Sequence, residues 1–269
     1  MLMGKYKRNY MQLTEEEINQ WNEMKQREII RKFYGLEVRK SLFREYPKAA
    51  RHYLSLFPNH YLDIVDLKNE QELNDLADKY LEMLDSSGTP ERTVLNWIRD
   101  NRAYFIIGSI LQNYNFGHHN AFIFPELKLG TTLQVDFLII GKNSGGYEFI
   151  FVELEARHGK ITMANGELGD VFRKGIRQVK DWGDWLEMYF QSFQETLLKY
   201  KNPEQQLPIE FMKPDRTRLH YVVVAGRRSD FNEKTYRIKR RTKDEQKIEL
   251  LHYDNLYDTA KAVIGKSTY

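Results

Sequence analysis

The sequence predicts an α/β fold, in which a central mixed sheet is flanked by helices and preceded by a helical amino-terminal region. Three consecutive apolar segments have the length of strands, and short turn-forming separators join them. Amphipathic patterns lie before and after these segments and predict the flanking helices. From residue 90 onward, the expected order is therefore helix, three-stranded meander, helix and strand.

The three strand segments span residues 121–127, 133–141 and 147–155. Their separators are short and rich in turn residues, as in Lys142–Gly146. Short separators favour antiparallel hairpins, because a parallel connection needs a crossover of about a dozen residues or more. Two further strands are expected, at residues 219–225 and 248–253.

Helices are expected on either side of these strands. One begins at Pro90, where Thr89 can serve as the N-cap, and runs to Leu111 with a weak point at Asp100. A long helix is expected over residues 170–200, and a closing helix begins at Asp254. The loop before Pro90 places a domain boundary at residue 88. The predicted parts are a helical region, residues 1–88, and an α/β domain, residues 89–269.

The amino-terminal region begins with a predicted helix after Thr14, which has the capping-box spacing to Glu17. Gly35 is expected to end this helix, and a second helix is expected through Leu42 and Tyr46. A third amphipathic helix is expected over residues 69–84. Apolar residues recur at roughly helical spacing in the first helix: Ile18, Trp21, Met24, Ile29 and Phe33.

Composition excludes some classes of protein. The chain has 269 residues and no cysteine, so disulfides and thiolate zinc sites are excluded. No apolar run approaches the roughly 20 residues that span a bilayer, and the first residues lack the apolar core of a secretory signal. We therefore expect a cytoplasmic protein without a membrane partner. The net charge of +3 is too close to balance to reveal the partner.

Three acidic residues lie in or at the end of apolar strand segments. Glu153 and Glu155 are two residues apart, so they point to the same face of their strand. Asp136 lies within the apolar run of the preceding strand. Because an isolated buried carboxylate is unfavourable, these groups are expected to bind a cation or to have raised pKa values. An arginine partner in the core is the structural alternative for Asp136.

Five sequence elements occur in the order found in one nuclease family. They resemble the opening helix of the Shedu nuclease domain, its Asp-Phe strand, its Val-Glu-Leu-Lys motif, its Gln-containing helix and its closing Tyr-Asp-x-Leu element. The chain from about residue 88 is thus similar to the Shedu (SduA-like) family of the PD-(D/E)XK restriction-endonuclease-like superfamily. The elements are, in order, Glu91–Leu111, Val135–Leu138, Val152–Glu155, Gln178–Trp182 and Leu251–Leu256.

This resemblance implies a metal-dependent DNA endonuclease or nickase that acts in bacterial defence against phage. It implies Mg²⁺ or Mn²⁺ as cofactor, held by Asp136, Glu153 and the backbone carbonyl of Leu154. Carboxylate and carbonyl oxygens suit these cations, which activate water and stabilise charge on a phosphate. Gln178 is expected to hold a water molecule or a phosphate oxygen.

The sequence departs from the family pattern at Glu155, where the motif has a lysine. That lysine orients the attacking water and offsets negative charge in the family. Glu155 could instead act as general base or as a further metal ligand. Lys174 is the first choice to supply the missing cation, because it shares a helical face with Gln178. Arg157 and Lys160 are the other candidates.

DNA contacts are expected from Arg157, Lys160, Arg240 and Arg241. The last two belong to a basic run whose alternative interpretation is a solvated strand or loop.

Two other functions stay open at this point. The chain could be a DNA- or partner-binding module on a decayed nuclease scaffold, or its helical region could build a structural assembly. Self-association into a homo-oligomer is expected in either case.

Overall fold

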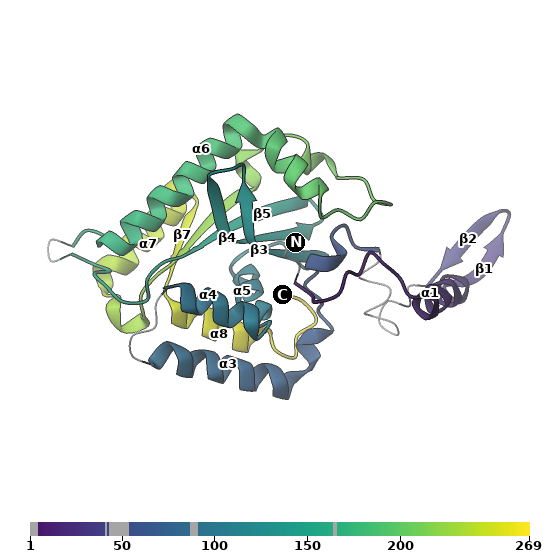
Figure 1. Ribbon diagram of the computed structural model, residues 1–269, viewed down its shortest axis with the longest axis horizontal. Coiled ribbons are helices and arrows are strands. Elements are labelled where there is room, and N and C mark those ends of the chain that lie inside the picture. The colour runs from purple at the N-terminus through teal and green to yellow at the C-terminus, as the bar shows by residue number, and fades with distance from the viewer. Residues whose placement is uncertain (1–4, 41, 43–53, 87–90, 164–165) are drawn as a thin grey trace.

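A computed structural model describes residues 5–40, 42, 54–86, 91–163 and 166–269 of the chain. Its centre is a five-stranded sheet with the order β3-β4-β5-β6-β7 (Figure 1). β3, β4 and β5 are antiparallel, whereas β6 is parallel to β5 and β7 is parallel to β6. The predicted meander and mixed sheet are confirmed. The strands are β3 (Asn120–Leu129), β4 (Leu133–Asn143), β5 (Gly146–Leu154), β6 (Leu219–Val224) and β7 (Ile248–Leu251).

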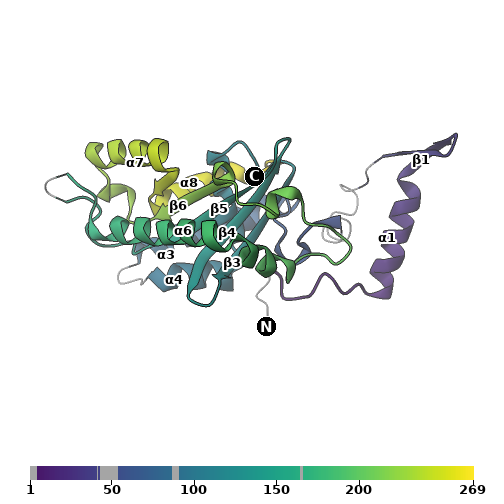
Figure 2. The same ribbon diagram turned by 90° about the horizontal axis from the view of Figure 1, so that it is seen from above.

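Helices cover both faces of this sheet. The long helix α6 crosses one face, and α5 and α8 pack on the other, with α4 beside them and α3 as the outermost layer (Figures 1 and 2). Each face is filled by its own apolar cluster, because successive residues of a strand point to opposite faces. These helices are α3 (Glu70–Asp85), α4 (Glu91–Asp100), α5 (Tyr104–Gly108), α6 (Asp170–Leu198) and α8 (Tyr253–Val263).

The helix α6 lies unusually close to the sheet at Gly175. A Cβ atom at this position would lie 2.5 Å from Val223 Cγ1 and 3.0 Å from Glu155 Cγ. Only a residue without a side chain allows this approach. Buried Phe172, Val179 and Trp182 recur at helical spacing around Gly175 and hold the helix against the sheet. The start of α6 is thereby brought against the carboxyl end of β5.

The predicted weak point after Pro90 is confirmed as a break between two helices. α4 ends at Asp100, and α5 begins at Tyr104. Between them Arg102 has a φ of +52°, a left-handed conformation that ends a regular helix. The apolar residues of α5 still point into the core, where Ile106 and Ile107 are fully buried.

The prediction of one helix from Thr14 to Gly35 is wrong in its second half. The helix α1 (Glu15–Arg27) has the predicted capping box at Thr14, but a hairpin of β1 (Ile29–Phe33) and β2 (Leu36–Arg39) follows it. Tyr34 and Gly35 have φ values of +45° and +79°, the two positive angles of a type I′ hairpin turn. β-branched residues before the turn and Val38 after it favour strands over a helix.

The α1–β1–β2 unit projects from the body of the molecule as an arm (Figures 1 and 2). The extended segment before it contacts the body through Lys5, whose ammonium donates to Tyr61 O at 2.9 Å. The helix predicted through Tyr46 falls mostly outside the described residues; Leu42 is buried against Met24 of α1.

Homo-oligomerisation stays a prediction. No helix in the described part of the chain is long and apolar enough to span a membrane.

The helix α3 lies before the boundary predicted at residue 88, yet it shares a core with the α/β domain. Leu73, Tyr80 and Leu84 belong to the apolar cluster that also contains Tyr253 and Leu256 of α8. The division into two domains stays a prediction, and α3 is packed as a further layer of the sheet domain.

The basic run near the carboxyl terminus forms a helix, α7 (Glu233–Gln246), and the alternative of a strand or loop is wrong. Asn232 caps its start, with a side chain that accepts the Thr235 N–H at 3.1 Å. Lys247 ends it with a φ of +55°. The helix lies against β7, beside α6 (Figure 2).

Candidate active site

Asp136 and Glu153 lie on neighbouring strands and on the same face of the sheet. The register of β4 and β5 pairs Phe137 with Val152, so one step further it places Asp136 opposite Glu153. By alternation, both carboxylates are on the face that α6 covers, together with Leu138. Glu153 is almost fully buried, with 3% of its surface exposed.

The backbone of Leu154 lies next to the pair Asp136 and Glu153. Its N–H donates to Asp136 Oδ2 at 2.8 Å, so it points toward β4. The carbonyl of a strand residue points to the same side as its N–H, which brings Leu154 O to the same edge. The next N–H, from Glu155, points the other way and donates to Val224 O at 2.8 Å. Asp136, Glu153 and the Leu154 carbonyl therefore form a set of three oxygen donors.

Glu155 makes an ion pair with the lysine that the sequence suggested. Lys174 Nζ of α6 lies 2.7 Å from Glu155 Oε2. The carboxylate side chain is 2% exposed and the lysine side chain is 54% exposed, so the cation lies at the surface above a buried anion. The close approach of α6 at Gly175 makes this contact possible. A cation thus lies beside the position where the family motif has its lysine.

Gln178 lies one turn after Lys174, at a half-buried position of α6. Lys174, Gln178 and Trp185 are within about 40° of each other around the helix axis. Trp185 contacts the β3–β4 turn, since a Cβ atom on Gly130 would lie 3.2 Å from its ring. This flank of α6 therefore faces the end of β4 that carries Asp136. The Gln178 side chain makes no hydrogen bond to any residue that the structure describes.

The donor set fits a hard divalent cation. Two carboxylates and a carbonyl are oxygen ligands of the kind that Mg²⁺ and Mn²⁺ accept, with water molecules completing the coordination. Within the described ranges, no three His, Cys, Asp or Glu side chains lie together as a metal site. The predicted ligand set contains two such side chains, Asp136 and Glu153, and takes its third oxygen from the backbone.

Arg157 and Lys160 have different environments. Arg157 is 2% exposed, and its Nη2 donates to the carbonyl of Ser86 at the end of α3. Burial, followed by the nearby charge of Arg227, lowers the pKa of the Arg157 guanidinium. Lys160 is exposed in the loop before α6. A phosphate contact by Arg157 stays a prediction that its burial disfavours, and Lys160 remains accessible.

Arg240 and Arg241 are both exposed on α7 but face different directions. Arg241 lines a groove between α6 and α7, together with Lys180. Arg240 lies outside the residues that line this groove. The structure therefore separates two arginines that are adjacent in the sequence. A phosphate contact by Arg240 stays a prediction that its position outside the groove disfavours.

Residues near the carboxyl terminus support the site in a way that the sequence did not predict. The Tyr253 hydroxyl donates to the backbone carbonyl of Glu155 at 2.6 Å. Asp254 accepts two hydrogen bonds from Arg227, at 2.8 and 3.0 Å. Arg227 also donates to Leu84 O at 2.9 Å, which ties β6 and α8 to the end of α3. The Tyr-Asp element was visible in the sequence, but its partners were not.

One family model matches residues 88–257, and its description is Shedu protein SduA, C-terminal. The match covers more than half of the chain and includes Asp136, Glu153, Gln178 and Tyr253. The chain belongs to the Shedu SduA C-terminal family. The resemblance inferred from the five sequence elements is confirmed. A search of curated proteins gave no match.

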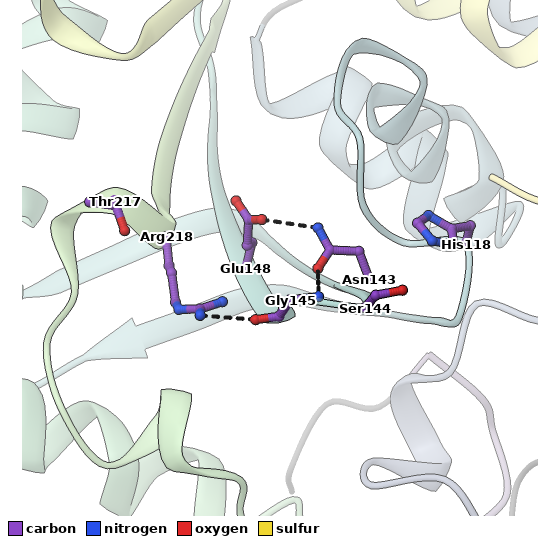
Figure 3. Close-up of a pocket in the computed structure, with 7 residues that line it drawn as sticks. All are labelled: His118, Asn143, Ser144, Gly145, Glu148, Thr217 and Arg218. Carbon is purple, nitrogen blue, oxygen red and sulfur yellow. Dashed lines mark hydrogen bonds between the residues drawn. The ribbon is translucent and has the colours of Figure 1, made fainter.

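A second polar pocket lies at the opposite end of β5, on the other face of the sheet (Figure 3). Glu148 accepts a hydrogen bond from Asn143 Nδ2 at 3.3 Å and lies 2.7 Å from His220 Nε2. Arg218 donates to the Gly145 carbonyl at 2.9 Å. Burial lowers the pKa of His220, so its imidazole is neutral near pH 7 and Nε2–H donates to Glu148. Glu148 and Arg218 of this pocket are therefore already hydrogen-bonded to neighbouring groups of the protein.

Proposed function

We propose that the chain is a nuclease of PD-(D/E)XK type that cleaves or nicks DNA by metal-dependent phosphodiester hydrolysis. Its proposed role, defence of bacteria against phage, follows from its membership of the Shedu family. The observation that carries the chemical proposal is the facing pair Asp136 and Glu153, with Lys174 beside Glu155 at the end of the same strand.

Asp136, Glu153 and the Leu154 carbonyl would hold the divalent cation. Hydrolysis of a phosphodiester needs an activated water and stabilisation of negative charge, and a bound Mg²⁺ or Mn²⁺ supplies both. The Leu154 N–H fixes the Asp136 carboxylate through Oδ2.

Lys174 would offset negative charge on the substrate phosphate. Its ammonium donates to Glu155 Oε2. Because its side chain is half exposed, its positive charge lies where a substrate phosphate would approach. Glu155, held by Lys174 and through its backbone by Tyr253, is positioned to accept a proton from the attacking water. The Gln178 amide, one helical turn further, would orient that water or a phosphate oxygen.

The test is cleavage of supercoiled plasmid in Mg²⁺ or Mn²⁺, with Asp136→Ala and Glu153→Gln as site variants. We expect both variants to lose metal-dependent nicking. The matched control is Glu148→Gln, which changes another carboxylate on β5, at the opposite end and on the opposite face. The control is expected to keep full activity.

The second candidate function is a DNA- or partner-binding module on a decayed nuclease scaffold. It is favoured by one observation, the glutamate at position 155 where the family motif has lysine. Plasmid that is bound but never cut, with every divalent metal tested, would support this second function and refute the first.

A further inference from the structure

A cationic groove separates α6 from α7. The loop before α6 forms its third wall, with Leu168 near the floor. Apolar residues Ile176 and Ile238 lie between the two helices, and Glu167 is the carboxylate in the lining. Four cations line the groove, one from α6 and three from α7: Lys180, Lys234, Arg237 and Arg241.

The three cations of α7 share one face of the helix. Lys234, Arg237 and Arg241 are spaced by three and four residues, so their side chains project from the same side. The orientation of the helix is set by Thr235 and Thr242, which are buried on the neighbouring side. All three cations are exposed, and Lys180 is exposed on the opposite wall.

The four groove cations share one feature, which concerns their charge partners. None of the four makes an ion pair with a carboxylate among the residues that the structure describes. Arg237 and Arg241 are four residues apart on one helix, a spacing at which like charges are destabilising. Seven arginines elsewhere in the domain do have carboxylate partners: Arg92, Arg99, Arg173, Arg216, Arg218, Arg227 and Arg228. Arg102, Arg157, Arg177 and Arg240 have none in the described part of the chain, but they lie outside the groove lining.

The groove is continuous with the candidate active site. A shallow depression on the outer face of α6 shares Ile176 and Lys180 with the groove. Its lining also includes Arg177 and Lys174, with Asp170 and Asp181 as its two carboxylates. Lys174 contacts Glu155. A row of cations thus runs from the buried carboxylate at the end of β5, over α6, to α7.

The lining favours a duplex over a single strand. Proteins that bind single strands without sequence preference stack the bases on aromatic side chains. No aromatic residue lines the groove in the described ranges. Lysine and arginine contacts to phosphates position a duplex and carry no base-sequence information.

We propose that the groove between α6 and α7 binds the phosphate backbone of duplex DNA and holds the duplex against the candidate active site. The choice of DNA rests on the proposed function, whereas the position of the contact rests on the four groove cations. Binding here is independent of base sequence and strongly dependent on salt.

The test is the affinity of the full-length chain for a short fluorescent duplex in EDTA, measured by anisotropy over a series of salt concentrations. The double variant Arg237→Ala/Arg241→Ala is expected to bind about tenfold or more weakly. Its log–log salt slope should fall by about 1.8, since each lost phosphate contact removes about 0.9. The matched control is Arg240→Ala, one residue away on the same helix and outside the groove, which should change affinity less than about twofold.

Three outcomes would overturn the proposal. The first is an unchanged salt slope in the double variant. The second is a loss of duplex affinity in Arg240→Ala as large as that in Arg241→Ala alone. Equal losses would show that affinity follows the net charge of the helix and not the groove. The third is tighter wild-type binding to a single strand of the same length. Because EDTA prevents cleavage, loss of duplex binding in the double variant supports the groove even where the plasmid assay shows no nuclease.

Discussion

Both ends of β5 carry glutamates, but these side chains differ in burial and in their bonding partners. At the start of the strand, Glu148 is bonded to the neutral groups His220 and Asn143, which come from the adjoining strands. At the other end, Glu153 and Glu155 are buried more deeply, and a surface lysine from α6 contacts Glu155. The first arrangement is local to the sheet, whereas the second depends on a helix packed over it.

This difference is the reason why we propose the chemistry at the end of β5 that carries Glu153. The partners of Glu148 are half-buried groups that hydrogen-bond to it within the sheet. Lys174 is half exposed beside the buried Glu155, and Asp136 faces Glu153 across the strands.

Metal affinity should separate the two ends of β5 most clearly. Mn²⁺ binding, followed by calorimetry or electron paramagnetic resonance, is expected to weaken at least about 100-fold in Glu153→Gln, because a ligand loses its charge. Glu148→Gln should bind Mn²⁺ like the wild type. Equal weakening in both variants would mean that the metal is not held by the end of β5 that carries Glu153.

The charge of Lys174 should have the next largest effect. Lys174→Met is expected to lower kcat by about 10²–10³-fold, as for the loss of one donor to a developing charge. Lys174→Arg keeps the cation and should recover part of that loss. The measurement is single-turnover cleavage at saturating metal. Equal rates for the methionine and arginine variants would contradict a role for the charge.

The stability of the active-site end should depend on pH through His252. Burial lowers the pKa of His252 to about 4, and its Nδ1 accepts the Asn255 N–H as the N-cap of α8. The folded pKa lies below the unfolded value of about 6.5, so this stability is complete above pH 6.5 and is lost as the pH falls toward 4. At about 1.4 kcal/mol per pKa unit, the loss is about 3 kcal/mol at most.

Urea unfolding at pH 7.5 and pH 5 measures this dependence. His252→Asn keeps a capping side chain and cannot be protonated, so its unfolding free energy should change less between the two pH values. His220→Asn is the comparison at the other end of β5, where burial also lowers the pKa. An unchanged pH dependence in the His252 variant would contradict the assignment to this residue.

The hydroxyl of Tyr253 should have the smallest effect on stability. Tyr253→Phe removes the bond to the Glu155 carbonyl and is expected to destabilise the chain by about 1–2 kcal/mol. As a positioning residue for Glu155, Tyr253 should affect kcat more than KM. A change in KM alone would indicate a role in substrate binding instead.

Local pattern predicted most of the sheet but little of the arm. Alternating apolar runs with short turns are read directly from the chain, so β3, β4 and β5 were predicted in order and direction. At Ile29 and Phe33 helical spacing and strand propensity compete. The chain forms a hairpin here, because Tyr34 and Gly35 both adopt the positive φ of a two-residue hairpin turn.

The sequence by itself determined the order of the strands along the chain, the shared face of Glu153 and Glu155, and the family elements in their order. The first two features follow from local spacing. That Asp136 meets Glu153 was expected from the family resemblance, and the register of β4 and β5 decides it. Only the tertiary structure decided that Lys174 meets Glu155 and that Tyr253 holds its carbonyl. These contacts join residues 19 and 98 positions apart, and they depend on how α6 and α8 pack on the sheet.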